Sequence, residues 1–177
     1  MARSWPYPVY DAAWTYILKN DAARAEEKYD EVNKLAPRGY FTTKTALDCL
    51  RRERSGEIGS GAYKILVLLE DTPESDQRRV LSALVQKWPR FPAAWEKLSL
   101  VLNDDISRLA AIESGLMYEP DDETKGALLL NKALALDRQG KKGDAVKILG
   151  SLALDPQSTM NSEITAKFAL RQILRGK

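Results

Sequence analysis

The sequence predicts an all-α protein of about ten helices. Apolar residues recur at three- and four-residue spacing along most of the chain, which is the period of one face of an α-helix. Prolines and glycines interrupt this pattern at intervals that suit helices joined by short connections. No segment sustains the alternation of apolar and polar residues that is typical of a half-buried strand.

The elements follow in order from these signals. The predicted helices cover residues 8–19, 21–35, 41–55, 60–70, 75–87, 92–103, 105–118, 123–139, 142–153 and 160–175. A proline follows several of them, where it pushes the preceding residue out of the helical region: Pro37, Pro73, Pro89, Pro120 and Pro156. The run from Ile65 to Leu69 could be a strand by composition, but the helical pattern continues on both sides of it, so we expect a helix.

Three acidic residues mark predicted helix starts. Asp21, Asp105 and Asp122 suit the cap or the first turn, where a carboxylate meets free amide groups and the positive end of the helix dipole.

Composition argues against several classes of function. Lys and Arg number 27 and Asp and Glu 25, so the net charge of +2 is too small to predict nucleic-acid binding. The chain has no histidine, which removes the commonest metal ligand and general base. Cys49 is the single cysteine, so neither an intrachain disulfide nor a cysteine-based zinc site can form. We therefore expect no catalytic residue, no metal and no cofactor.

The location of the protein is predicted from what the sequence lacks. Its first residues do not contain the apolar core of a secretory signal. No run reaches the roughly 18 apolar residues that suggest a membrane span. These two features, together with a single thiol, predict a soluble cytoplasmic protein that does not enter a membrane.

The proline spacing suggests a repeat. Pro37 and Pro73 are separated by 36 residues, and so are Pro120 and Pro156. This spacing resembles that of the tetratricopeptide repeat (TPR) family, whose unit of about 34 residues is a helix pair that ends near a proline. The resemblance implies a right-handed α-solenoid of antiparallel helix pairs in one domain over residues 1–177. The pairs would lie near 8–37, 41–73, 92–120 and 123–156, with an extra helix at 75–87 and a capping helix at 160–175.

The TPR pattern can be placed on this sequence position by position. Small residues would stand where the two helices of a pair cross: Ala13, Cys49 and Ala133. Another small residue would open each second helix, at Ala25, Gly61 and Ala145. Large apolar residues would follow it inside the pair: Tyr29 with Val32, Ile65 with Leu68, and Leu149 with Leu152. The capping helix would turn five residues inward: Ile164, Phe168, Leu170, Ile173 and Leu174.

The resemblance also implies a concave groove that holds a peptide or helix of a partner protein. Its positions fall on Tyr10, Trp14, Leu50, Glu96, Leu100, Leu130 and Leu134. Chaperone-binding members of the family clamp a terminal carboxylate with Lys and Asn at such positions, and those residue types are missing here. The groove is largely apolar, which suits an amphipathic helix or an apolar peptide.

These observations predict a scaffold or adaptor that binds another protein, and they leave alternatives open. The chain could be an inhibitory or immunity-type protein that neutralises an enzyme, and the groove could be covered by a second copy in a homodimer. The basic groups at 51–54, 78–79 and 141–142 lack interleaved aromatic residues, so they are interpreted as solvated surface and not as a nucleic-acid site. The glycine-rich segment 56–61 is interpreted as a turn between helices.

Overall fold

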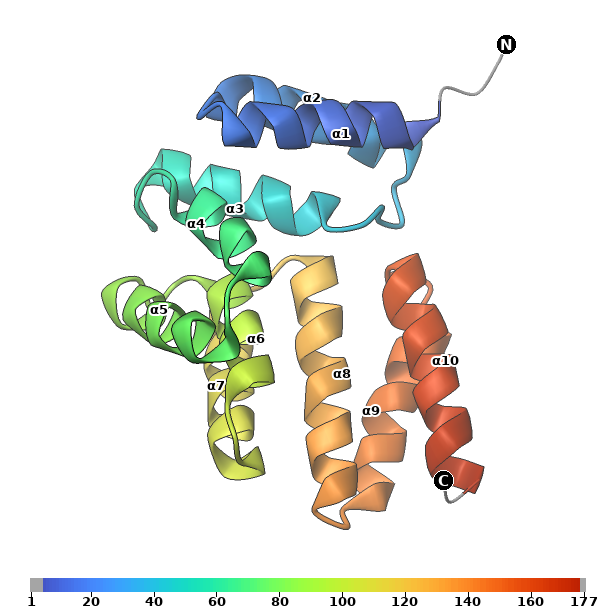
Figure 1. The fold of residues 1–177 in the computed structure, drawn as a ribbon. Helices are drawn as coiled ribbons and strands as arrows, with labels where there is room; N and C mark the ends of the chain where they lie inside the picture. The colour runs from blue at the N-terminus through green and yellow to red at the C-terminus, as the bar shows by residue number, and fades with distance from the viewer. Residues whose placement is uncertain (1–4, 176–177) are drawn as a thin grey trace.

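The computed structural model describes residues 5–175, and all regular secondary structure in that range is helical (Figure 1). The α-helices are α1 (Pro6–Leu18), α2 (Ala22–Leu35), α3 (Thr43–Ser55), α4 (Ala62–Leu68), α5 (Glu74–Lys87), α6 (Pro92–Val101), α7 (Asp105–Met117), α8 (Asp122–Arg138), α9 (Lys142–Leu154) and α10 (Met160–Arg175). A 3₁₀ turn, η1 (Leu69–Asp71), extends α4. The all-α prediction is confirmed for this range, and the predicted domain limits also include residues 1–4 and 176–177, which lie outside it.

The helix ends follow from local chemistry. Asp21 accepts a hydrogen bond from the Arg24 amide and caps α2, as expected. The caps of α7 and α8 are Asp104 and Asp121, so the predicted acids one residue later lie in the first turn. The glycine-rich segment is a connection, because Gly56 ends α3 and Gly61 precedes α4, both at positive φ.

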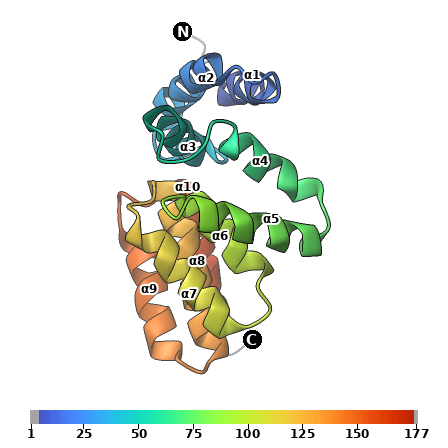
Figure 2. The same cartoon turned by 90° about the vertical axis from the view of Figure 1, so that its left-hand side faces the viewer.

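The helices form two groups that run in different directions (Figures 1 and 2). α1 and α2 lie side by side across the top of Figure 1 with α3 below them, and α6 to α10 run down the view beneath. In the lower group each helix packs on the next one, and α8 also packs on α6 and α10. The two groups meet where α3 packs on the start of α8.

The helix α5 corresponds to the extra helix that the repeat pattern predicted at 75–87, which does not belong to a helix pair. It packs on α6, immediately before the lower group begins. The change of direction therefore falls at the extra helix that the sequence predicted at 75–87, between Pro73 and Pro89.

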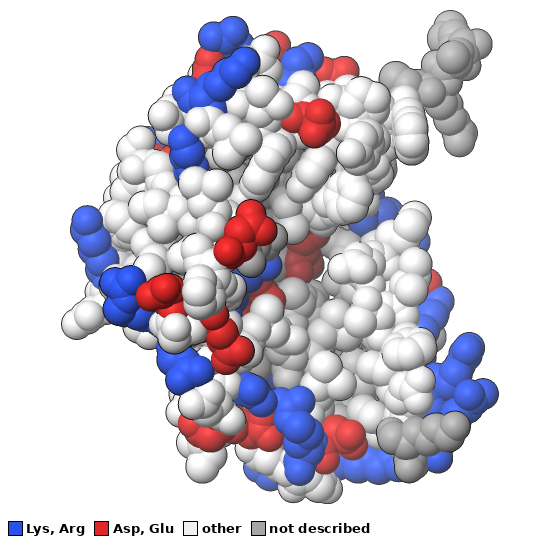
Figure 3. All heavy atoms as spheres, in the orientation of Figure 1, with Lys and Arg blue, Asp and Glu red and all other residues white. Residues whose placement is uncertain are grey.

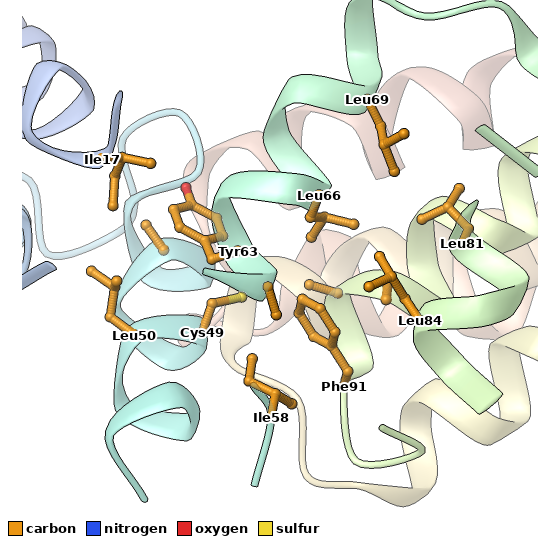
Figure 4. Close-up of a cluster of buried hydrophobic side chains, with 14 of the residues drawn as sticks. Ile17, Cys49, Leu50, Ile58, Tyr63, Leu66, Leu69, Leu81, Leu84 and Phe91 are labelled. Atoms are coloured by element: carbon orange, nitrogen blue, oxygen red, sulfur yellow. The ribbon is translucent and has the colours of Figure 1, made fainter. Parts of the chain in front are cut away.

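Two apolar cores hold the groups together. The first extends from α1 to α6 and includes Ile17, Cys49 and Phe91 (Figure 4). The second joins α8, α9 and α10. The predicted crossing residues Ala13, Cys49 and Ala133 are all buried, as expected for positions of close helix approach.

The predicted register of α4 is wrong by one residue. Ile65 and Leu68 are exposed, whereas Ala62, Leu66 and Leu69 are buried. The reason is that Gly61 adopts a left-handed conformation and stays outside the helix, so the buried face starts at Ala62.

Candidate functional site

A hollow of about 700 Å³ lies between the upper helices and the first turns of α6, α8 and α10. Figure 3 shows it as a depression with mostly uncharged atoms around it and acidic atoms deep inside. We call it the aromatic hollow, because five ring side chains line it: Tyr7, Tyr10, Trp14, Phe41 and Tyr63. Its volume lies within the range of about 300–1,000 Å³ that is usual for ligand pockets.

The upper wall is built by α1 and by the connection before α3. The Tyr10 ring lies 5.0 Å from that of Phe41, and its hydroxyl is 3.0 Å from Thr42 Oγ1. Trp14 follows Tyr10 by one helical turn, so both rings are on the same side of α1. Phe41 adopts a positive φ of 50°. Tertiary contacts therefore hold this ring in a backbone conformation that is uncommon for its residue type.

The floor is formed by three helices that all begin at the hollow. Ala93 of α6, Ala127 of α8 and Asn161 of α10 line it, and they are separated from one another by 34 residues. Residues seven positions later lie two turns along the same helix face. At those positions stand Leu100, which is 50% exposed, and Leu134, which is 39% exposed. An apolar surface thus continues from the hollow down α6 and α8.

The predicted groove residues divide into three sets. Tyr10, Trp14, Glu96 and Leu130 line the aromatic hollow together. Leu100 and Leu134 lie outside it, on the continuation of its floor. Leu50 belongs to neither, because it is buried in the first core, where Figure 4 shows it near Ile17. Its assignment to an open groove is corrected here: the second helix pair turns this face of α3 toward α1 and α2.

A polar junction between α3 and α8 closes the floor. The Glu123 carboxylate of α8 accepts hydrogen bonds from the backbone amides of Lys44, at 2.8 Å, and Thr45, at 3.1 Å. These amides belong to the first turn of α3, whose own cap residue Thr42 makes no side-chain cap hydrogen bond. A carboxylate from a distant part of the chain therefore caps α3 and meets the positive end of its dipole.

Burial governs the charge state of this junction. It raises the pKa of Glu123 to about 8, and the nearby Asp121 carboxylate adds to the shift, although the two amides and Lys44 oppose it. Burial likewise raises the pKa of Asp121. The Glu123 Oε1 atom has no hydrogen-bond partner among the described residues. An undissociated Glu123 is the form that this environment favours.

Several lining residues were not predicted from the sequence. Tyr7, Phe41, Glu123 and Asn161 lie at helix starts or in a connection, outside the mid-helix positions that the repeat pattern marks. The adjacent aromatic residues Tyr40 and Phe41 could have indicated this site. Two large rings in a short connection between helices are expected to pack against a neighbouring surface.

Arg52, near the end of α3, links this helix to the connection between α7 and α8. The Arg52 guanidinium donates to the backbone oxygens of Tyr118, at 3.1 Å, and Glu119, at 3.0 Å, and it pairs with Asp48 at 2.7 Å. Arg52 is therefore not solvated surface, which corrects its interpretation from the sequence. A second hollow of about 570 Å³ surrounds it, but the helix ends there are the C-termini of α3 and α7, whose dipoles disfavour an anion.

Cys49 and the acidic side chains are the other groups that could take part in covalent or metal chemistry. Burial raises the pKa of the Cys49 thiol well above its usual value, so the thiolate is scarce at neutral pH. Within residues 5–175 no group of three or more Cys, Asp and Glu side chains is placed to hold a metal ion. In the same range, no helix has both the length and the apolar character of a membrane span.

Comparisons with family models, with curated protein sequences and with solved structures gave no match to this chain.

Proposed function

We propose that the chain is a protein-interaction module of the TPR-like α-solenoid type, and that it binds a short apolar segment of a partner protein in the aromatic hollow. The observation that carries this proposal is the hollow itself, with five rings around about 700 Å³ at the junction of the two helix groups. Large rigid rings that line a concave site are typical anchors of protein recognition, because they contribute contact area at a small entropic cost.

The size of the hollow limits what enters it. An α-helix with its side chains is about 10–12 Å wide, so a space of about 700 Å³ accommodates a few side chains rather than a whole helix. The bound segment would place anchoring side chains between Tyr10, Trp14 and Leu130. The rest of it would lie on Leu100 and Leu134, which continue the floor.

The TPR-like assignment is supported by the arrangement of the floor. Three residues that line the hollow, Ala93 of α6, Ala127 of α8 and Asn161 of α10, are each 34 residues apart, and about 34 residues is the length of the family's repeat. The site would then lie on the face that such repeats present to their ligands.

Peptide display on the purified protein tests the proposal. Peptides selected from a random library should contain large apolar residues. Their affinity should fall at least about tenfold, or 1.4 kcal/mol, on Trp14→Glu. The variant Leu134→Glu should also weaken binding, and because Leu134 is partly exposed this substitution leaves the core intact.

The matched control is Leu154→Glu, on an exposed residue of α9 that does not line the hollow. It should bind the selected peptides like the unmodified chain. Selected peptides that bind Trp14→Glu and Leu134→Glu with unchanged affinity would place the binding site elsewhere and refute the proposal.

A further inference from the structure

The last helix, α10, turns a face of small residues toward its neighbours. The buried residues are Ser162, Ala166, Ala169 and Ile173. The predicted inward face is therefore wrong in part: Ile173 is buried as predicted, whereas Ile164 is 59%, Phe168 61% and Leu174 66% exposed. The physical reason is close approach: a Cβ on Gly126 of α8 would come within 2.0 Å of Ser162 Oγ. Large side chains cannot occupy an interface this tight.

The outer face of α10 carries two adjoining rows of side chains. One row is apolar and consists of Met160, Ile164 and Phe168, all exposed and spaced four residues apart. The other row has the same spacing, begins one residue before Phe168 and is basic: Lys167, Arg171 and Arg175. Lys167 pairs with Glu163, whereas Arg171 and Arg175 make no ion pair with a described residue.

The position of α10 explains why this face is open. In the lower group each helix covers the apolar side of the one before it, and α10 is the last described helix of that layer (Figure 1). A further helix placed against Met160, Ile164 and Phe168 would continue the layer. It would remove from water three large apolar side chains that are more than half exposed.

The basic row decides which helix fits. A second copy of this chain whose α10 packed parallel to this one would bring Arg171 and Arg175 of both copies together, and like charges oppose such contact. A helix with carboxylates beside its apolar row would instead pair with the two arginines.

We propose that the outer face of α10 is a second docking surface, and that it binds an amphipathic helix of a partner protein whose apolar row is flanked by Asp or Glu. This surface adjoins the continuation of the hollow's floor, because Phe168 follows Asn161 by seven residues just as Leu134 follows Ala127. It differs from the hollow in its basic row, and the variant Trp14→Glu distinguishes the two sites.

Two labelled synthetic helices test the proposal by fluorescence anisotropy. They share the same leucine positions, and every charged position is Glu in one and Lys in the other. The intact chain should bind the Glu peptide at least about tenfold more tightly than the Lys peptide. The double variant Ile164→Ser/Phe168→Ser should weaken the Glu peptide by a similar factor. The double variant Arg171→Glu/Arg175→Glu should reverse the preference.

Two control variants test whether binding is specific to the outer face of α10. Ile106→Ser, at an exposed apolar residue of α7, and Trp14→Glu, in the hollow, should leave binding of the Glu peptide unchanged. The four substituted residues of α10, which are Ile164, Phe168, Arg171 and Arg175, are all exposed. Circular dichroism of these variants should therefore show an intact fold.

Four results would overturn the proposal. The first is equal affinity for the two peptides, and the second is Glu-peptide binding that the α10 variants do not change. The third is binding to vesicles of anionic lipid with no binding of either peptide, which would make this face a membrane contact. The fourth is a dimer in sedimentation that Ile164→Ser/Phe168→Ser dissociates.

Discussion

At the scale of single residues, Glu123 has an unusual environment, because its carboxyl is buried between two helices. It lies in the first turn of its own helix, α8, and it also satisfies two backbone amides at the start of α3. Both amides donate to Oε2, and an undissociated acid also offers an acceptor oxygen there. Since burial raises its pKa to about 8, the neutral acid is the form that the fold stabilises.

This environment predicts a pH dependence of stability. Between the ordinary pKa of glutamate, 4.5, and about 8, the folded chain holds a proton on Glu123 that the unfolded chain has released. The contribution of Glu123 to the free energy of unfolding is fully present below pH 4.5. It decreases as pH rises toward 8, with a slope of up to about 1.4 kcal/mol per pH unit. Urea unfolding at pH 5, 6.5 and 8 measures this effect.

The variant Glu123→Gln isolates the contribution of this residue. Its amide oxygen can still accept from Lys44 and Thr45, and it does not titrate, so the variant should gain stability relative to the unmodified chain as pH rises. Asp121 and Lys44 face the same junction and are present in both proteins, so their titration largely cancels. Glu27→Gln, at an exposed residue, should show no such gain. A stability difference that is constant from pH 5 to 8 would contradict this account.

At the scale of helices, contact distance decides which residues face inward. α8 and α10 approach closely enough that Gly126 has no room for a side chain. Gly126→Ala should therefore lower the free energy of unfolding by about 1–3 kcal/mol, because Ser162 and its backbone must shift. The loss should be smaller in a chain that also carries Ser162→Gly, which removes the obstructing side chain.

For a second helical glycine, Gly150, we expect the opposite change in the free energy of unfolding. Gly150 lies in helix α9, and a Cβ there meets nothing within 4 Å. Gly150→Ala should raise the free energy of unfolding by up to about 1 kcal/mol, because alanine loses less backbone entropy in a helix. Thermal or urea unfolding compares the two variants. Equal effects of Gly126→Ala and Gly150→Ala would show that α8 and α10 do not pack this closely.

At the scale of the whole molecule, the two cores predict regional stability. Leu149 is fully buried in the core shared by α8, α9 and α10. Leu149→Ala should cost about 2–5 kcal/mol and should reduce hydrogen-exchange protection more in these three helices than in α1–α3. Leu47→Ala, in the first core, should show the reverse distribution. Uniform loss of protection in both variants would indicate one cooperative unit despite the two cores.

The helices themselves could be predicted from the sequence, because their signals are local. Apolar spacing, the capping acids and the prolines all act within a few residues of one another, and the helices lie where these signals placed them. Tyr10, Trp14, Glu96 and Leu130 could also be predicted as neighbours, because a helix period and a repeat length relate them. The lack of histidine and the single cysteine likewise follow from the sequence alone.

Only the tertiary structure decided which of two similar faces is buried. Leu50 and Phe168 are both large and apolar at helical spacing, yet one lies in the core and the other is exposed. The difference depends on the distance between helix axes and on the angle between the helices of the lower group and those of the upper group. The role of Glu123 depends on the same arrangement, since its partners lie 78 and 79 residues away. Local periodicity does not encode these distances, because they arise from the packing of the whole chain.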